Sequence, residues 1–122
     1  MKKALMCVAL VSVLSACAGS PEYQAAKEFG EKNNPVHFST VEKCNMGWKR
    51  AQIFVSNNSH MRMAVNTDAV INTYDDVNGY ADKYNITRLD AGDGSCDITI
   101  QIGTAFGQNW PTIQRMINFI RV

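Results

Sequence analysis

The stretch Cys96-Asp97-Ile98-Thr99-Ile100-Gln101-Ile102 decides the fold of this chain of 122 residues. Its apolar residues alternate strictly with polar ones, which is the period of a β-strand with one dry and one wet face. Residues 84–89 are also typical of a strand, and the turn sequence Ala91-Gly92-Asp93-Gly94 separates the two. We therefore expect a β-hairpin that is covered on one face and wet on the other.

Two helices are expected to cover the dry face of this hairpin. The first follows Ser39-Thr40-Val41-Glu42, which fits a capping box starting at Ser39. Its apolar residues then recur at helical spacings of three and four: Val41, Cys44, Trp48, Ala51 and Val55. The second helix closes the chain, with Asn109 as its cap and Pro111 in its first turn. Its predicted buried stripe is Trp110, Ile113, Ile117 and Ile120.

A second hairpin is predicted between the first helix and the strands at 84–102. Met61, Met63 and Val65 alternate with more polar residues, Thr67-Asp68 supplies turn chemistry, and residues 70–74 are rich in β-branched and aromatic side chains. The order is thus helix, four strands, helix. It predicts an α+β fold in which a four-stranded antiparallel sheet carries the helices on one face.

Cys44 and Cys96 are expected to meet in the layer between helix and sheet. Cys44 falls on the inner stripe of the first helix, and Cys96 falls on the inner face of the last strand. Because two independent periodicities turn both sulfurs inward, we predict a disulfide, provided that the compartment is oxidising. Such a bridge closes a loop of about fifty residues and contributes up to ~4 kcal/mol in the chain-entropy model.

Residues 1–16 are typical of a secretory signal. Met1-Lys2-Lys3 is basic, residues 4–14 are apolar except for Ser12, and the apolar run is too short to span a bilayer. Leu14-Ser15-Ala16-Cys17 resembles the lipobox of bacterial lipoproteins. The resemblance implies cleavage before Cys17, acylation of Cys17 and, because Ala18 follows, sorting to the outer membrane. The alternative is an ordinary signal peptide followed by an unrelated cysteine.

The rest of the chain is divided near Val36. Residues 17–35 are expected to form a lipidated N-terminus and tether, because Gly and Pro punctuate both ends and the helical periodicity is poor. Residues 36–122 are expected to form the small domain. Its core is marginal at this size, so the disulfide matters for its stability.

Composition excludes two classes of partner. Twelve Lys and Arg side chains stand against eleven Asp and Glu, so the chain lacks the basic surface of a nucleic-acid binder. No polybasic attraction to anionic lipid is expected either, and acyl chains at Cys17 are the expected membrane anchor. A hydrophobic content of 46% is too high for a disordered chain.

No catalytic, cofactor or metal site is predicted. His60, Met61 and Met63, with Met46, suggest a soft-metal site, but core methionines beside an exposed histidine explain the pattern better. The remaining candidates have structural explanations. We interpret Asp90, Asp93 and Asp97 as turn residues rather than as a calcium loop, and Asp75-Asp76 as solvated charge in a loop. We expect His37 to be an exposed linker residue, and Trp48 and Trp110 to lie in the core.

The predicted domain resembles the small helix-grip domains of envelope lipoproteins, such as those in the C subunit of the outer-membrane β-barrel assembly machine. The resemblance rests on the helix at 41–55, on Val70-Ile71-Asn72-Thr73, and on Gly92-Asp93-Gly94 before Ile98-Thr99-Ile100. It implies a binding or structural role without enzymatic activity, facing the periplasm, with an envelope protein as partner.

Two other functions stay open. One is an inhibitor or exclusion factor that blocks a receptor or a lytic enzyme. The other is a carrier of a small ligand, held between the closing helix and the sheet. An oversized apolar cavity under Trp110 favours the carrier, whereas an exposed apolar patch favours a protein partner.

Overall fold

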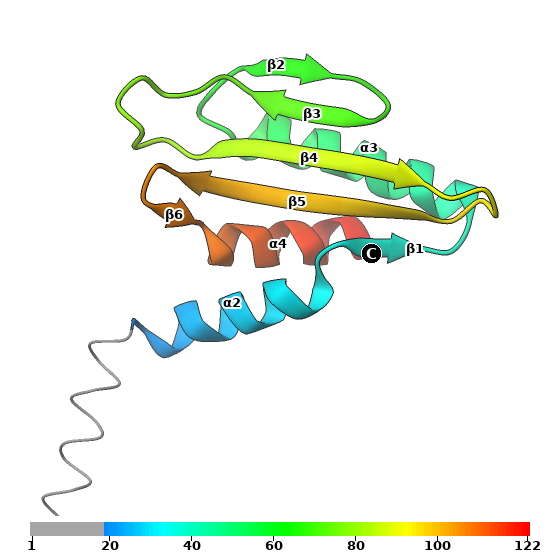
Figure 1. Ribbon diagram of the computed structural model, residues 1–122, viewed down its shortest axis with the longest axis horizontal. Helices are drawn as coiled ribbons and strands as arrows, with labels where there is room; N and C mark the ends of the chain where they lie inside the picture. The colour runs from blue at the N-terminus through cyan, green and yellow to red at the C-terminus, as the bar shows by residue number, and fades with distance from the viewer. Residues whose placement is uncertain (1–18) are drawn as a thin grey trace, which may run out of the picture.

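The computed structural model describes residues 19–122, so the predictions for the signal and for Cys17 lie outside the described residues. Figure 1 shows a sheet with helices packed along it. The elements follow one another as α2 (Pro21–Asn33), β1 (Val36–Phe38), α3 (Val41–Asn58), β2 (Met63–Asn66), β3 (Val70–Thr73), β4 (Lys83–Asp90), β5 (Cys96–Thr104), β6 (Gly107–Gln108) and α4 (Trp110–Arg121).

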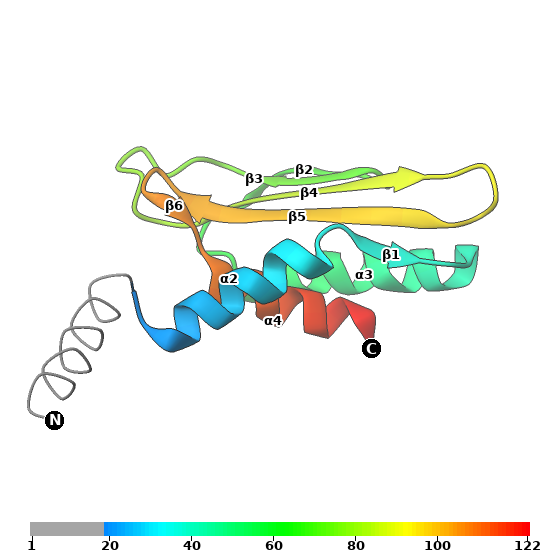
Figure 2. The same cartoon turned by 60° about the horizontal axis from the view of Figure 1, so that its bottom comes forward.

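All strands pair antiparallel in one sheet. The order across the sheet is β1-β5-β4-β3-β2, and β6 pairs with the far end of β5. In Figure 2 the helices lie on one side of the sheet and leave the other side open. The α+β class, the antiparallel sheet and the one-sided helical cover are therefore confirmed.

The predicted number of four strands is wrong, because β1 and β6 were not anticipated. Both strands are too short, at three and two residues, to show a period in the sequence. The pairing of β6 depends on glycine: a Cβ added at Gly103 would lie 2.5 Å from the Gly107 carbonyl oxygen. The segment between these glycines is therefore a tight hairpin whose backbones approach closely.

The core lies between the central hairpin β4–β5 and the helices α3 and α4. Ile86 faces Ile100 across the ladder, and Tyr84 faces Ile102. All four side chains are buried, whereas Gln101, between two of them on β5, is exposed. The alternation that defined the hairpin is thus confirmed residue by residue.

The first predicted helix begins one residue later than its capping box indicated. Thr40, not Ser39, is the cap, and its hydroxyl accepts a hydrogen bond from the Lys43 N–H at 3.2 Å. Val41 is consequently the first residue of α3 and is exposed, so its place on the predicted buried stripe is wrong. The other four stripe residues are buried, and α4 has the predicted Asn109 cap.

The segment expected to be a tether folds as a helix from Pro21 onward. Ser20 caps α2 by accepting the Tyr23 N–H at 3.1 Å. The helix packs on α4 through small side chains: a Cβ added at Gly30 would lie only 2.7 Å from the Trp110 ring. Small residues allow this close approach but give little apolar periodicity. The folded part of the chain therefore begins before Val36, and the predicted boundary is wrong.

Asn34 joins α2 to the sheet. Its side-chain Nδ2 donates to the Ile100 carbonyl oxygen at 2.8 Å, and its Oδ1 accepts the Ile100 N–H at 3.0 Å. The amide thus satisfies both backbone groups of Ile100 on the edge of β5 between β1 and β6. An edge filled in this way is protected against pairing with another chain.

Candidate functional site

A groove of about 580 Å³ lies between α3 and the end of β4. It forms because β4 pairs with β3 only as far as Thr87 but pairs with β5 as far as Asp90. The last residues of β4 therefore extend past the end of β3. We call this the Arg88 groove; its lining residues are Val41, Asn45, Trp48, Lys49, Gln52, Asp68, Arg88 and Asp90.

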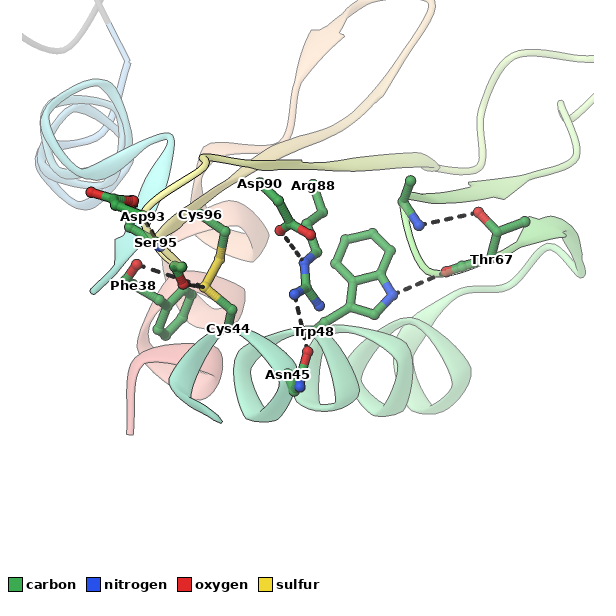
Figure 3. Close-up of polar contacts among 12 residues, drawn as sticks. Phe38, Cys44, Asn45, Trp48, Thr67, Arg88, Asp90, Asp93, Ser95 and Cys96 are labelled. Carbon is green, nitrogen blue, oxygen red and sulfur yellow. Dashed lines mark hydrogen bonds and ion pairs between the residues drawn. A yellow bond between two sulfur atoms is a disulfide. The ribbon is translucent and has the colours of Figure 1, made fainter. Parts of the chain in front are cut away.

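Arg88 is held in place from two sides of the groove. Its Nε donates to Asp90 Oδ1 at 2.7 Å, and its Nη2 donates to Asn45 Oδ1 at 3.0 Å (Figure 3). The Arg88 side chain is only 11% exposed, whereas that of Asp90 is 62% exposed. A planar guanidinium fixed by its own neighbours keeps its charge in one geometry without further ordering.

Trp48 forms the apolar part of the same groove. The indole is buried, and its Nε1 donates to the Thr67 carbonyl oxygen at 3.0 Å (Figure 3). Thr67 in turn accepts the Val70 N–H through its hydroxyl at 3.0 Å. The turn between β2 and β3 is therefore tied to α3, and Trp48 is a core residue as predicted.

The predicted disulfide between Cys44 and Cys96 is confirmed. Their Cα atoms are 6.0 Å apart across a separation of 52 residues, and both side chains are buried. The bridge lies beside the groove, as Figure 3 shows. Asn45 follows Cys44 directly, and Asp90 faces Cys96 in the ladder. The disulfide thus links α3, which carries the acceptor Asn45, to β5, the strand that pairs with β4 at Asp90.

The groove is better suited to a polar, extended polypeptide segment than to an apolar ligand. Its rim carries both signs of charge, with Lys49 on α3 and Asp68 and Asp90 on the strand side. Within the described part of the chain, no strand pairs with the β3 side of β4 beyond Arg88. Strand edges of this kind can accept a backbone, and the mixed charges can select its side chains.

The three aspartates around the β4–β5 turn do not converge. Asp90 pairs with Arg88, Asp97 Oδ1 lies 2.8 Å from His37 Nδ1, and Asp93 accepts both the hydroxyl and the N–H of Ser95. The Ser95 hydroxyl and then its N–H lower the pKa of Asp93. Each carboxylate therefore supports local structure. Over residues 19–122, His, Cys, Asp and Glu form no group of three able to hold a metal ion.

His37 was predicted to lie in a linker, and this prediction is wrong. It lies in β1, directly opposite Asp97 of β5. Its side chain is exposed, as predicted, but it is engaged in the cross-strand contact with that carboxylate. The structural role of this histidine was missed because β1 itself was not predicted.

The methionines at 61 and 63 are only partly buried, so their predicted place in the core is wrong. β2 is the outermost strand of the sheet, and Met63 contacts the core from its side. His60 is exposed, as expected, and Met46 is exposed on α3. Alternation along β2 correctly defined a strand, but the helices do not cover this edge.

Asp75 and Asp76 have different roles in the loop between β3 and β4. Asp75 forms an exposed ion pair with Lys83 at 3.1 Å. Asp76 instead accepts backbone N–H groups from Ala81, Asn78 and Tyr80. These bonds, that of Ala81 most of all, lower the pKa of Asp76. Asp76 therefore shapes the loop and is more than the solvated charge that the sequence suggested.

Trp110 is covered by α2 on one side of its ring. α2 lies on its ring at Gly30 with no room for even one added carbon atom. The helix that had been predicted to be a tether thus packs directly on the Trp110 ring.

The Arg88 groove was missed in the sequence because its residues come from three separated segments: α3, the turn at Asp68 and the end of β4. Arg88 looks like an outward-facing position of a half-wet strand, and Asn45 looks like a solvated helix residue. A signal was nevertheless present in the sequence. Arg88 follows Tyr84 and Ile86 at intervals of two residues, so its side chain points to the same face of β4 as theirs, toward the helices.

Comparison with known proteins finds no relative of this chain. No family model matches the chain, and neither a curated protein nor a solved structure is significantly similar to it. Among residues 19–122, no helix has the length and apolar character needed to cross a membrane.

Proposed function

We propose that this chain is a lipoprotein of the bacterial outer membrane, anchored through Cys17, whose domain binds an envelope protein in the periplasm. In this proposal the domain is a binding module and catalyses no reaction. The Arg88 groove is its partner site. Lipid at Cys17 follows from the resemblance of Leu14-Ser15-Ala16-Cys17 to a lipobox.

The observation that carries the proposal is the Cys44–Cys96 disulfide. Structural disulfides persist in oxidising compartments such as the periplasm and are rare in the cytosol. A secretory signal and a buried disulfide are independent features, and both are typical of exported proteins. Together they support an envelope location.

The groove supports a protein partner rather than a small ligand. It is open, polar and mixed in charge, and its central cation is already neutralised by Asp90. A site for a small ligand is typically a more enclosed and more apolar cleft. An extended polypeptide can instead lie along the open edge of β4 and exchange hydrogen bonds with the exposed carboxylate of Asp90.

Metabolic labelling tests the anchor. Cells that express the full chain are given a radioactive or clickable fatty acid, and incorporation is compared among wild type, Cys17→Ser and the matched control Cys7→Ser. We expect label in wild type and Cys7→Ser and none in Cys17→Ser. Wild-type labelling retained in Cys17→Ser contradicts the proposed anchor.

Site-specific photocrosslinking tests the partner site. A crosslinking amino acid at Lys49, on the groove, is compared in intact cells with one at Lys27, an exposed position on α2. We expect a discrete adduct from position 49 only, and its loss when Arg88→Ala is added. An adduct that is indifferent to Arg88→Ala, or equal from both positions, contradicts a partner in this groove.

A further inference from the structure

Three apolar side chains are strongly exposed at the end of the molecule opposite the Arg88 groove. Val77 is 100% exposed, Tyr80 73% and Phe106 78%. Val77 and Tyr80 come from the loop between β3 and β4, and Phe106 comes from the turn between β5 and β6. The rings of Tyr80 and Phe106 stack with their centroids 5.8 Å apart. We call these three residues the aromatic tip.

The aromatic tip is held in shape by the loop beneath it. Asp76 accepts the N–H groups of Tyr80 and Ala81 at 3.2 and 2.9 Å, and Gly79 has a φ of +71°. The Ala105 N–H donates to the Gly79 carbonyl oxygen at 3.4 Å and joins the two turns. Apolar side chains that are fixed in water, instead of packed inward, mark a surface that contacts something else.

The start of α2 lies at this same end. A Cβ added at Gly19 would lie 3.7 Å from the Tyr23 ring, and the Tyr23 hydroxyl donates to the Gln108 carbonyl oxygen at 3.4 Å. Tyr23 and Phe106 also line one shallow cleft. Figures 1 and 2 both show the first turn of α2 at the end of the sheet that carries the β3–β4 loop and β6.

We propose that the aromatic tip docks on the bilayer surface into which the acyl chains at Cys17 insert; this inference rests on the proposed lipid anchor. Gly19 lies two positions after Cys17 in the chain, and two residues span at most about 7 Å. An anchor on so short a tether holds this end of the domain at the membrane. Aromatic side chains prefer the interfacial layer of a bilayer, where their rings are partly buried among headgroups.

The charges around the tip indicate which lipids it contacts. Asp75, Asp76 and Asp82 lie on the same loop, and of the basic residues only Lys83 is paired with one of them in the described structure. The Asp82 carboxylate accepts from Asn109 Nδ2 at 2.6 Å. Carboxylates are repelled by an anionic surface, so docking depends on apolar contact with zwitterionic headgroups and weakens as anionic lipid is added.

Docking by the tip also orients the partner site. The tip flanks the first residue of β4, whereas the groove contains Arg88 and Asp90 near its last residue. A strand of eight residues is about 26 Å long. The Arg88 groove therefore faces away from the membrane, toward the periplasmic space, where an envelope protein can reach it.

Tryptophan fluorescence on vesicles tests the docking. The full chain is purified from membranes in detergent, its acylation is read by intact mass, and it is reconstituted in phosphatidylcholine vesicles with brominated acyl chains. Phe106→Trp is compared with Leu89→Trp, a matched control at an equally exposed apolar residue (74%) near the groove. The wild-type emission of Trp48 and Trp110 is subtracted from both.

We expect the indole introduced at position 106 to emit at shorter wavelength and to be quenched by bromine, and the indole at position 89 to remain unquenched. Adding anionic lipid should reduce the quenching at position 106. Acylated protein with no quenching at 106, or with equal quenching at both positions, overturns the docking while the lipid anchor stands. Protein without acyl chains overturns both. An indole at 106 that is protected only in native membranes identifies a protein occupant and also overturns the docking.

Discussion

The hairpins β2–β3 and β4–β5 share an alternating sequence pattern but lie in different environments. In β4–β5, Ile86, Ile98, Ile100 and Ile102 are each no more than 1% exposed, beneath α3 and α4. In β2, by contrast, Ala64, Val65 and Asn66 are exposed and only Met63 is partly buried. Alternation of apolar and polar residues defines a strand in both cases. Whether its apolar face is buried depends on how far the helices extend across the sheet.

Apart from Ile71 of β3, which is fully buried in the core, the outer hairpin β2–β3 depends on a few polar contacts. Trp48 Nε1 binds the Thr67 carbonyl oxygen, Gln52 Nε2 donates to Asn66 Oδ1 at 2.9 Å, and the buried Thr73 hydroxyl accepts the Tyr84 N–H at 3.0 Å. Few buried apolar contacts and exposed backbone hydrogen bonds are characteristic of regions that open locally. The central hairpin and the outer hairpin should therefore differ in their sensitivity to mutation.

The largest expected effect is on the central hairpin, through its disulfide. Replacing both Cys44→Ala and Cys96→Ala should lower the free energy of unfolding by about 4 kcal/mol, because the unfolded chain regains the freedom of a loop of 52 residues. Urea denaturation of the purified protein measures this change. Wild type in reducing agent is the matched control and should be destabilised to a similar degree. Equal stability of oxidised and reduced wild type contradicts the prediction.

A pair of methionines compares the two regions directly. Met116 is fully buried in α4, whereas Met63 contacts the core only from the edge. Met116→Ala should cost about 2–5 kcal/mol of unfolding free energy, as for a buried side chain. Met63→Ala should cost roughly 1 kcal/mol, because Met63 is only partly buried at the edge of the sheet and part of its surface stays in water. Equal losses in urea denaturation would show that the outer hairpin is as well covered as the central one.

Periodicity predicted the elements that bury a full face. The hairpin at 84–102, α3 and α4 each repeat apolar residues long enough to show their period, and the same periods placed both sulfurs in one layer. β1, β6 and α2 could not be found in this way. Their places depend on side-chain pairing by Asn34, on the close approach at Gly103, and on small-residue packing at Gly30, none of which has a period.

Sequence periodicity cannot predict the Arg88 groove or the aromatic tip, for a related reason. Both are assembled from segments far apart in the chain, at places where a regular element ends. Arg88 lines a groove only because β3 stops pairing at Thr87, and Phe106 meets Tyr80 only because two turns touch. The sequence contains the residues, but the topology decides which of them are neighbours.

The contact between Trp48 and Thr67 provides a test of what holds the outer hairpin. Trp48→Phe keeps a buried ring and removes one hydrogen bond, so we expect a loss of about 1 kcal/mol in global stability. Amide hydrogen exchange should accelerate at residues 67–70 and stay unchanged in β4 and β5. Trp110→Phe is the control and should leave exchange at residues 67–70 unaltered. Uniform acceleration across the sheet contradicts a local tie.

The smallest expected effect is at His60, just before the outer hairpin. The side chain is exposed, and the turn around it is held by Ser59, whose hydroxyl accepts the Met61 N–H at 3.1 Å and donates to the Met61 carbonyl oxygen at 2.7 Å. Because this turn does not use the imidazole, His60→Ala should change the free energy of unfolding by no more than about ±0.5 kcal/mol. Ser59→Ala is the matched variant and should be the more destabilising of the two, since it removes both hydrogen bonds.

The soft-metal interpretation of His60 and the neighbouring methionines gives the opposite order. On that interpretation His60→Ala also releases bound metal, so one equivalent of copper or zinc per chain after dialysis, lost in His60→Ala, would contradict the prediction.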